Sequence, residues 1–159
     1  MSYALPNNIT LTGLKNLDLR IQNIATYLKS ELTWLDYSFG IADRCVEKKN
    51  DKDNFYPGVF LSNSVDPFDC MPHDEFNTSF WQVADSVKID NLSPGDVPMR
   101  NIEISCPVAC IFYVDIRKIS ISKPLAVTRS EIKQDIFDAF ASMYGVDATF
   151  NMTEIIDND

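Results

Sequence analysis

The sequence predicts a single α+β domain, in which an antiparallel sheet of four to five strands carries two helices packed on one face. Three observations support this class. Apolar residues recur with helical spacing at 12–31 and again at 129–143, and a long β-hairpin is indicated around a polar turn at 48–54. The chain has 159 residues, of which 45% are hydrophobic, and this is enough to bury one core without disulfides.

The first predicted helix follows an N-terminal arm. Residues 1–11 show no apolar period and include Pro6, so they are assigned to the arm. Thr12 is the expected N-cap of the helix. The helix itself is indicated by apolar residues spaced three or four apart, namely Leu14, Leu17, Ile21, Ile24 and Leu28.

The hairpin arms are predicted at 34–47 and 55–61, on either side of the polar turn. In the first arm apolar and polar residues alternate, and Gly40 is a candidate bulge. In the second arm Pro57 has no N–H to donate, so it suits an edge or an end of the strand better than its centre.

Two further strands are predicted after an irregular, acidic loop at 62–78. The first covers 80–84, and a second loop at 86–101 leads to a strand that runs without a break over 102–118. The long strand is indicated because every second residue from 102 to 116 is apolar. A strand of this length is expected to project beyond a compact domain or to pair with a neighbouring subunit.

The second helix is predicted to begin at a capping box. Thr128 and Glu131 have the T-x-x-E spacing of this motif, and the helix is expected to cover 129–143. The apolar stripes of both helices are expected to pack on one side of the long strand. The residues involved are Ile132, Ile136 and Phe140 on the second helix and Cys106, Val108, Cys110 and Phe112 on the strand.

The domain is expected to span 12–156. A last strand is predicted at 148–156, and 157–159 form an acidic tail. No stretch is apolar over the length of a membrane span, and the first residues lack the basic and apolar pattern of a signal peptide. The protein is therefore expected to be made and kept in a cytoplasm, without contact with a membrane.

The sequence contains no motif typical of a catalytic, cofactor-binding or metal site. Cys106 and Cys110, the closest pair of cysteines, would lie about 13 Å apart on a strand, which is too far for one tetrahedral ion. The four cysteines are therefore interpreted as structural. The alternative is a small enzyme or ligand-binding domain with a site at loop 62–78, where Cys70, His73, Asp74 and Glu75 lie.

The net charge and the aromatic residues bear on the partners of the protein. A formal net charge of −9 argues against sequence-independent binding of duplex DNA, which needs a basic stripe for the phosphates. The carboxylates gather in loops 62–78 and 86–101 and in the last residues, either as a solvated outer surface or as the wall of a channel for DNA. Aromatic and other residues with the composition of an interface are Phe68, Met71, Phe76, Tyr113 and Arg117.

With these elements in place, the chain resembles the tail-terminator and neck proteins of tailed bacteriophages. Those are small α+β subunits with a helix, a hairpin, further antiparallel strands, a helix and a last strand, assembled as a ring. The arm 1–11 and the loops 62–78 and 86–101 depart from this pattern, and they leave open another ring of the neck or a tail or capsid accessory protein. Three segments also look similar to small neck-region proteins encoded near portal genes in phages of gut bacteria, including crAss-like phages: YLKSELTWLDYSFGIADRCVEK, FYPGVF and IFYVDIRKI.

The resemblance implies a structural virion protein that is not an enzyme and uses no cofactor. It would be assembled in the cytoplasm of the host bacterium as a homo-oligomeric ring that connects the portal-proximal assembly to the tail. Its partners would be other neck, portal or tail proteins, and DNA would pass through the ring without specific binding. Besides the small enzyme, a regulatory interaction protein of a host remains an alternative.

Overall fold

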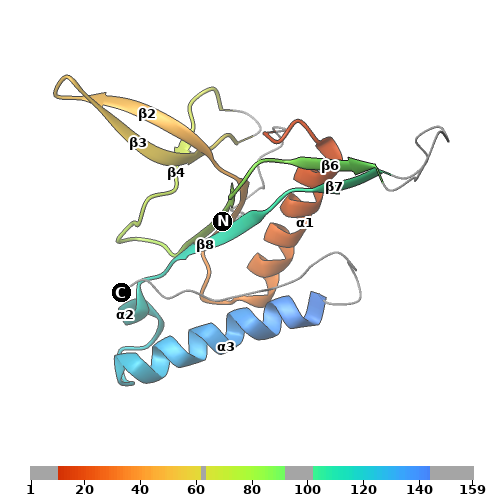
Figure 1. Ribbon diagram of the computed structural model, residues 1–159. Helices are drawn as coiled ribbons and strands as arrows, with labels where there is room; N and C mark the ends of the chain where they lie inside the picture. Colours follow the sequence, from red (N-terminus) through yellow and green to blue (C-terminus); the bar gives the residue numbers. More distant parts are fainter. Residues whose placement is uncertain (1–10, 62–63, 92–101, 144–159) are drawn as a thin grey trace.

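The computed structural model describes residues 11–61, 64–91 and 102–143, whose arrangement Figure 1 shows. The α+β class is confirmed. The described strands form two three-stranded sheets and a two-stranded ribbon, so the prediction of one sheet with four to five strands is wrong. In chain order the elements are α1 (Lys15–Glu31), β1 (Tyr37–Ile41), β2 (Asp43–Lys49), β3 (Lys52–Val59), β4 (Phe68–Asp69), β5 (Thr78–Val83), β6 (Lys88–Asn91), β7 (Ile102–Ser105), β8 (Val108–Tyr113), α2 (Ile116–Ile119) and α3 (Leu125–Met143).

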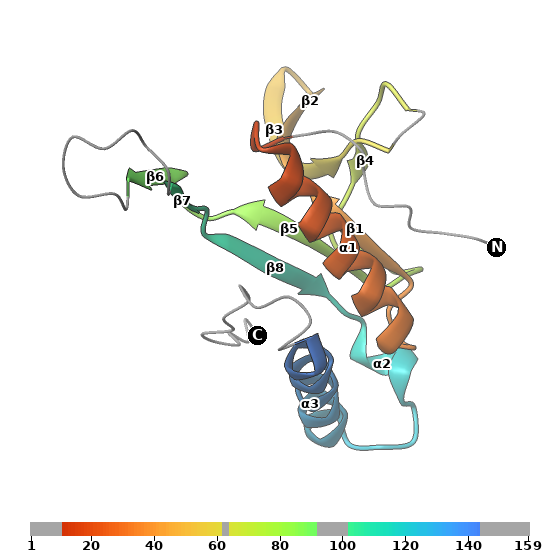
Figure 2. The ribbon, with the colours of Figure 1, turned by 90° about the vertical axis from the view of Figure 1, so that its right-hand side faces the viewer.

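A central sheet with the strand order β1-β5-β8 separates two hydrophobic cores. β1 runs parallel to β5, and β5 runs antiparallel to β8. Neighbouring residues of a strand point to opposite faces, so Trp81 lies in the core beneath the helices and Phe80 in the core beneath the second sheet. Figure 2 shows α1 lying across β1 and β5. The helices and the second sheet therefore cover opposite faces of the central sheet.

The second sheet has the strand order β2-β3-β4 and contains the predicted hairpin. Asn50 and Asp51 form a two-residue turn, with φ angles of 52° and 60°, as a type I′ turn requires. The strands therefore continue to Lys49 and Lys52, further into the polar segment than predicted. Pro57 is the sixth of the eight residues of β3 and lies opposite Arg44, and β3 is the middle strand of this sheet and not an edge.

The prediction of a single hairpin arm over 34–47 is wrong, because the chain changes sheets in the middle of this segment. β1 belongs to the central sheet, and β2 begins after Ala42, whose N–H donates to a β5 carbonyl at 2.7 Å. Five of the seven residues of β2 are charged and the strand shows no clear alternation, so the sequence pattern does not reveal which strand it pairs with. The bulge predicted at Gly40 is confirmed, since the register of β1 against β5 shifts between Ser38 and Ile41.

The unbroken strand predicted over 102–118 is also wrong. β7 pairs with β6 in a separate ribbon, whereas β8 pairs with β5 in the central sheet. Cys106 and Pro107 lie between β7 and β8. They face the four residues 84–87 that connect β5 to β6, so the register shifts by two. Pro107 has no N–H to donate, and this accounts for the break at this point.

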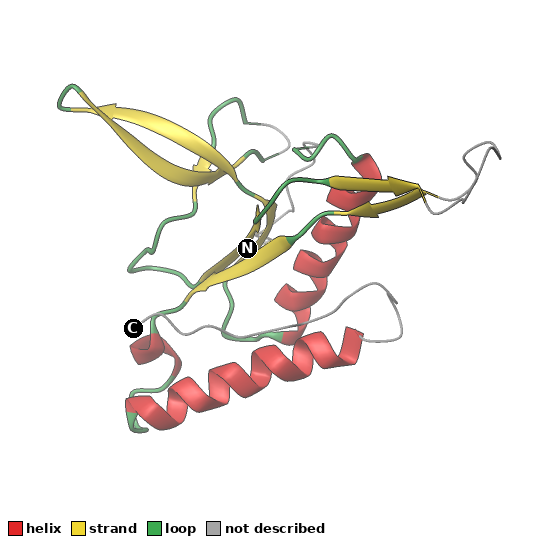
Figure 3. Cartoon of the chain, in the orientation of Figure 1, coloured by secondary structure: helices red, strands yellow, loops and turns green. Residues whose placement is uncertain are grey.

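The two ends of the predicted long strand lie in different surroundings. Figures 1 and 3 show that the ribbon β6–β7 extends away from the body of the molecule, as the length of the predicted strand suggested. At the other end, β8 is followed by the short helix α2. Asp115 starts this helix by accepting from the Arg117 N–H at 3.0 Å, which ends the extended conformation.

Helix α1 is confirmed, but its N-cap is Leu14 and not the predicted Thr12. Thr12 Oγ1 accepts from the Leu14 N–H at 3.1 Å and donates to Asp18 Oδ2 at 3.0 Å. Asp18 is only 3% exposed, so this bond satisfies a carboxylate that has little access to water. Thr12 therefore positions the start of the helix through Asp18.

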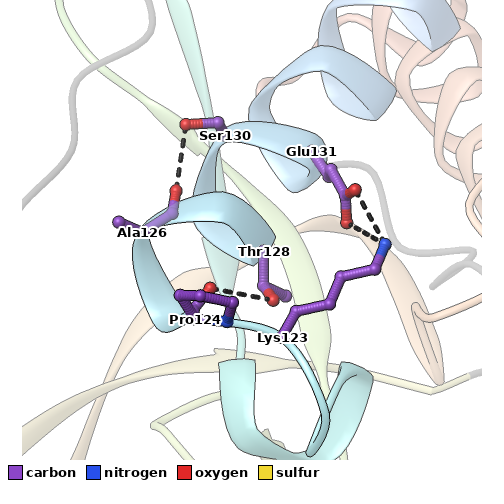
Figure 4. Close-up of polar contacts among 6 residues, drawn as sticks. All are labelled: Lys123, Pro124, Ala126, Thr128, Ser130 and Glu131. Atoms are coloured by element: carbon purple, nitrogen blue, oxygen red, sulfur yellow. Dashed lines mark hydrogen bonds and ion pairs between the residues drawn. The ribbon is translucent and has the colours of Figure 1, made fainter.

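Helix α3 begins at Leu125, one turn before the predicted start, and the capping box of Thr128 and Glu131 does not form. In the arrangement shown in Figure 4, Thr128 Oγ1 donates to the Pro124 carbonyl at 3.5 Å. Glu131 holds Lys123 Nζ at 2.8 Å from both carboxylate oxygens. Proline suits the start of a helix, because its fixed φ is helical and it leaves no N–H unsatisfied. Pro124 thus moves the start ahead of Thr128.

The predicted packing of both helices on one side of the long strand is confirmed for β8. The core beneath the helices contains Ile21 and Leu28 of α1 and Ile132, Ile136 and Phe140 of α3, and Val108, Cys110 and Phe112 of β8 pack against it. Cys106 precedes β8 and is partly buried. Most of the arm 1–11, the predicted strand 148–156 and the tail 157–159 lie outside the described residues.

Asn77 joins three segments at one end of the central sheet. Its Nδ2 donates to the Trp34 carbonyl at 2.9 Å, and its Oδ1 accepts from the Asp115 N–H at 2.7 Å. Its backbone N–H donates to Asp36 Oδ2 at 2.7 Å, while its carbonyl accepts from the N–H groups of Asp36 and Tyr37. Asn77 is 3% exposed, so water does not replace these bonds when they are lost.

We expect Asn77→Ala to lower the free energy of unfolding by about 2–4 kcal/mol, because the Trp34 carbonyl and the Asp115 N–H lose their side-chain partner. Chemical denaturation monitored by circular dichroism measures the change. Asn23→Ala on the exposed face of α1 is the matched control and should change stability by less than about 1 kcal/mol. Equal effects of the two substitutions would contradict this role of Asn77.

Candidate interaction surfaces

The residues considered for a ligand or metal site at loop 62–78 do not converge. Cys70 is fully buried in the core beneath the second sheet. His73, Asp74 and Glu75 are exposed at the surface of the loop. Within the described part of the chain, no group of three or more histidine, cysteine or acidic residues is arranged to hold a metal ion.

Burial keeps the cysteines in the protonated form. It raises the pKa of the Cys70 thiol to about 12, with the Asp69 carboxylate as a smaller cause. Burial also raises the pKa of Cys110 well above its ordinary value, and it is the main reason why the pKa values of Cys45 and Cys106 are raised. The thiolate is the form that attacks electrophiles and binds metals, so these shifts support the structural interpretation of the cysteines.

We expect a thiol reagent such as DTNB to modify Cys70 much more slowly than Cys45 in the native protein at pH 8. Cys45 is partly exposed, whereas Cys70 is 0% exposed and has a pKa of about 12. Raising the pH from 7 to 9 should accelerate labelling of Cys45 and leave Cys70 protected, since its thiolate is still scarce. Timed labelling followed by peptide mass mapping gives both rates, with the denatured protein as the reference. Similar native rates would contradict the buried position of Cys70.

The predicted interface residues Phe68 and Phe76 belong to an aromatic cluster that fastens loop 64–77 to β1. The ring centroids of Phe68 and Phe76 are 6.0 Å apart. The ring centroid of Tyr37 lies 6.2 Å from that of Phe68 and 4.9 Å from that of Phe76. His73 stacks on Phe76 with a centroid distance of 4.2 Å. Phe68 and Phe76 are half-buried, so most of their contact surface serves the packing of the loop itself.

The other predicted interface residues are distributed over three elements. Met71 lies in the loop and is 43% exposed. Tyr113 at the end of β8 is half-buried, with its ring centroid 5.6 Å from that of Phe80. Arg117 is exposed on α2. The structure thus brings Phe68 and Tyr113 to the margin of one core and leaves Met71 and Arg117 at the surface.

The hairpin β2–β3 carries a surface that the sequence pattern alone did not indicate. All residues from 46 to 55 are exposed. Val46 and Phe55 are directly opposite each other and are 56% and 54% exposed, and the Arg44 guanidinium lies 3.9 Å from the centre of the Phe55 ring. We call these three residues the hairpin face. A two-residue turn determines which residues face each other, so the turn sequence was the signal that could have revealed this pair.

A groove of about 400 Å³ lies where the end of α1 meets α3, and we call it the acidic groove. Three of its lining residues are carboxylates, and two are buried and apolar. Asp135 Oδ2 accepts from Trp34 Nε1 at 3.0 Å, and Asp138 Oδ1 accepts from Gln134 Nε2 at 2.9 Å. The lining residues are Glu31, Leu32, Thr33, Asp135, Asp138, Ala139 and Ser142.

Among the described residues, no helix combines the length and the apolar character that crossing a membrane requires. Comparison of the chain with protein-family models, with curated proteins and with solved structures finds no match. Function is therefore inferred from the residues and their geometry.

Proposed function

We propose that this protein is a structural, non-enzymatic subunit of a tailed bacteriophage, which forms a homo-oligomeric ring in the neck or tail and joins the portal-proximal assembly to the tail. The observation that carries the proposal is the hairpin β2–β3, whose outer half from 46 to 55 is exposed on both faces. A two-stranded hairpin without a covering layer is marginally stable in water. A neighbouring subunit that covers the hairpin face supplies the missing contacts.

The arrangement of the projecting elements supports a ring. Figures 1 and 2 show that the hairpin β2–β3 and the ribbon β6–β7 leave the body in different directions. A subunit with two such arms can contact its neighbours through different surfaces, and contacts of this kind close into a ring when the rotation between subunits permits it. The place in the neck or tail comes from the resemblance to tail-terminator and neck proteins.

The alternative of a small enzyme or ligand-binding domain has less support. Its site at loop 62–78 would combine Cys70 with acidic residues and His73, but Cys70 is fully buried and His73 is exposed. The raised pKa of Cys70, about 12, leaves almost no thiolate at neutral pH.

We expect the full-length protein to form oligomers larger than a dimer, and the double substitution Val46→Ser and Phe55→Ser to shift it toward the monomer. Both side chains are exposed, so their replacement should change the free energy of unfolding by less than about 1 kcal/mol while removing apolar contact area from the interface. Native mass spectrometry and sedimentation velocity over a concentration series measure the effect. Leu19→Ser with Val65→Ser, which are 51% and 93% exposed, is the control. A wild-type protein that stays a monodisperse monomer would rule out the ring.

We further propose that the acidic loop 64–77 borders the channel of the ring, where fixed negative charge repels the phosphates and keeps passing DNA from adhering. Its carboxylates at Asp66, Asp69, Asp74 and Glu75 are exposed. An electron-microscopy map of the assembled particle is the test, and we expect this loop at the lumen. A lumen with the acidic loops outside, lined instead by the basic residues Lys15, Arg20, Lys29 and Lys133, would show that this placement is wrong.

A further inference from the structure

We propose that the tip of the hairpin β2–β3 docks in the acidic groove of the next copy of this chain. The inference rests on the proposed function, because it names the contact through which neighbouring subunits of the ring meet. It joins two surfaces that are unlike each other in shape and charge: a projecting, basic tip and a recessed, acidic groove.

The hairpin tip offers lysines that have no ionic partner among the residues that the structure describes. Lys48, Lys49 and Lys52 are exposed, and no ion pair joins them to another described residue. Residues 48–53 carry a net charge of +1 in a chain whose net charge is −9. The tip is thus locally basic on an acidic protein, and its lysines favour a negatively charged surface.

The acidic groove has the complementary chemistry. Among the described residues that line it are three carboxylates and no basic side chain, and the buried side chains of Leu32 and Ala139 are apolar. A lysine can lay its apolar stem against such residues and place its ammonium group at the carboxylates. The hydrogen bond from Trp34 holds one oxygen of Asp135 in place and leaves the other for a lysine.

The geometry requires that tip and groove come from different copies. Figures 1 and 2, which are views turned by 90°, both place the hairpin at the end of the molecule opposite to α3. The tip therefore does not reach the groove of its own molecule. Docking between copies joins two different surfaces, and such a head-to-tail contact repeats from copy to copy until the ring closes.

Charge does not favour a symmetric contact between two hairpins in any register. β2 is an edge strand, so two copies could in principle pair it antiparallel around a two-fold axis. Residues that lie opposite each other in an antiparallel pair point to the same face of the sheet. With a two-fold axis this holds only when the axis passes beside one residue of β2, which then lies opposite its own copy. Centring on Cys45 sets Asp43 opposite Glu47. Centring on Val46 sets Arg44 opposite Lys48, and it also sets Asp43 opposite Lys49, so that like and opposite charges balance. The other registers place a charged residue opposite its own copy.

The test is a charge-reversal cycle on the full-length chain. Lys49→Glu with Lys52→Glu reverses the tip, Glu31→Lys with Asp138→Lys reverses the groove, and a fourth protein carries all four changes. Sedimentation equilibrium at low and at high salt measures the association constant. We expect each pair alone to weaken association at least about tenfold, and the combination to return it to within about threefold of the wild type. The wild-type contact should also weaken as salt increases, because the charges are exposed.

Lys15→Glu with Lys118→Glu is the matched control for the tip reversal, since it makes the same change in net charge at exposed sites away from the tip and groove. Circular dichroism shows whether each protein is folded, and the single changes Lys52→Glu and Asp138→Lys replace a double variant that is not. Assembly that is insensitive to both reversals, or that the combined variant does not recover, overturns this docking mode and leaves the ring intact. A monomeric wild type overturns both the docking and the proposed function.

Discussion

The alignment of the strands in the central sheet depends on the buried hydrogen bonds of Asn77. β5 has a parallel neighbour on one side and an antiparallel neighbour on the other, and the register of both pairs has to be set. A tight turn can set the register of an antiparallel pair, but a parallel pair has no such turn and needs another constraint. Asn77 supplies it by binding the backbone at the start of β1 and, through its side chain, the Asp115 N–H beyond β8. Ser38 and Ser79 extend this match with a buried bond of 2.9 Å between their hydroxyls. Both cores are built on the faces of the sheet aligned in this way.

The sequence was sufficient for features that depend on local spacing and insufficient for those that depend on partners. The apolar stripes of both helices follow from a helical period, and the structure buries them as predicted. Alternation shows that a strand has two unlike faces, but it does not show which strand lies beside it. Ala42 and Pro107, where the chain changes partners, therefore sit inside segments that read as continuous strands. Pro107 was the one local sign of a break, and Pro124 was a similar sign for the start of α3.

The same distinction applies to the candidate surfaces. A two-residue turn connects the strands that carry Val46 and Phe55. Once the turn is assigned to Asn50 and Asp51, the register of the hairpin places these two residues opposite each other. The acidic groove joins Glu31 to residues more than a hundred positions further along the chain, and only the packing of α1 on α3 brings them together. Cys70 shows the reverse case: its neighbours in the sequence suggest a polar loop site, yet the aromatic cluster folds the loop so that the thiol is in the core.

The proposed assembly follows from a difference in packing: the body of the molecule has two buried cores, whereas the outer half of the hairpin has none. The two cores lie on the faces of the central sheet, whereas the outer half of the hairpin relies on its cross-strand pairs and on the contact of Arg44 with Phe55, each worth about 0.2–1 kcal/mol. Val46 and Phe55 are 56% and 54% exposed, so covering the rest of each against a neighbour would add about 0.8–1.7 kcal/mol per side chain. Docking and ordering of the hairpin would then be coupled, and a single contact would be modest. A closed ring compensates for this, because each subunit is held by two such contacts and must break both to leave.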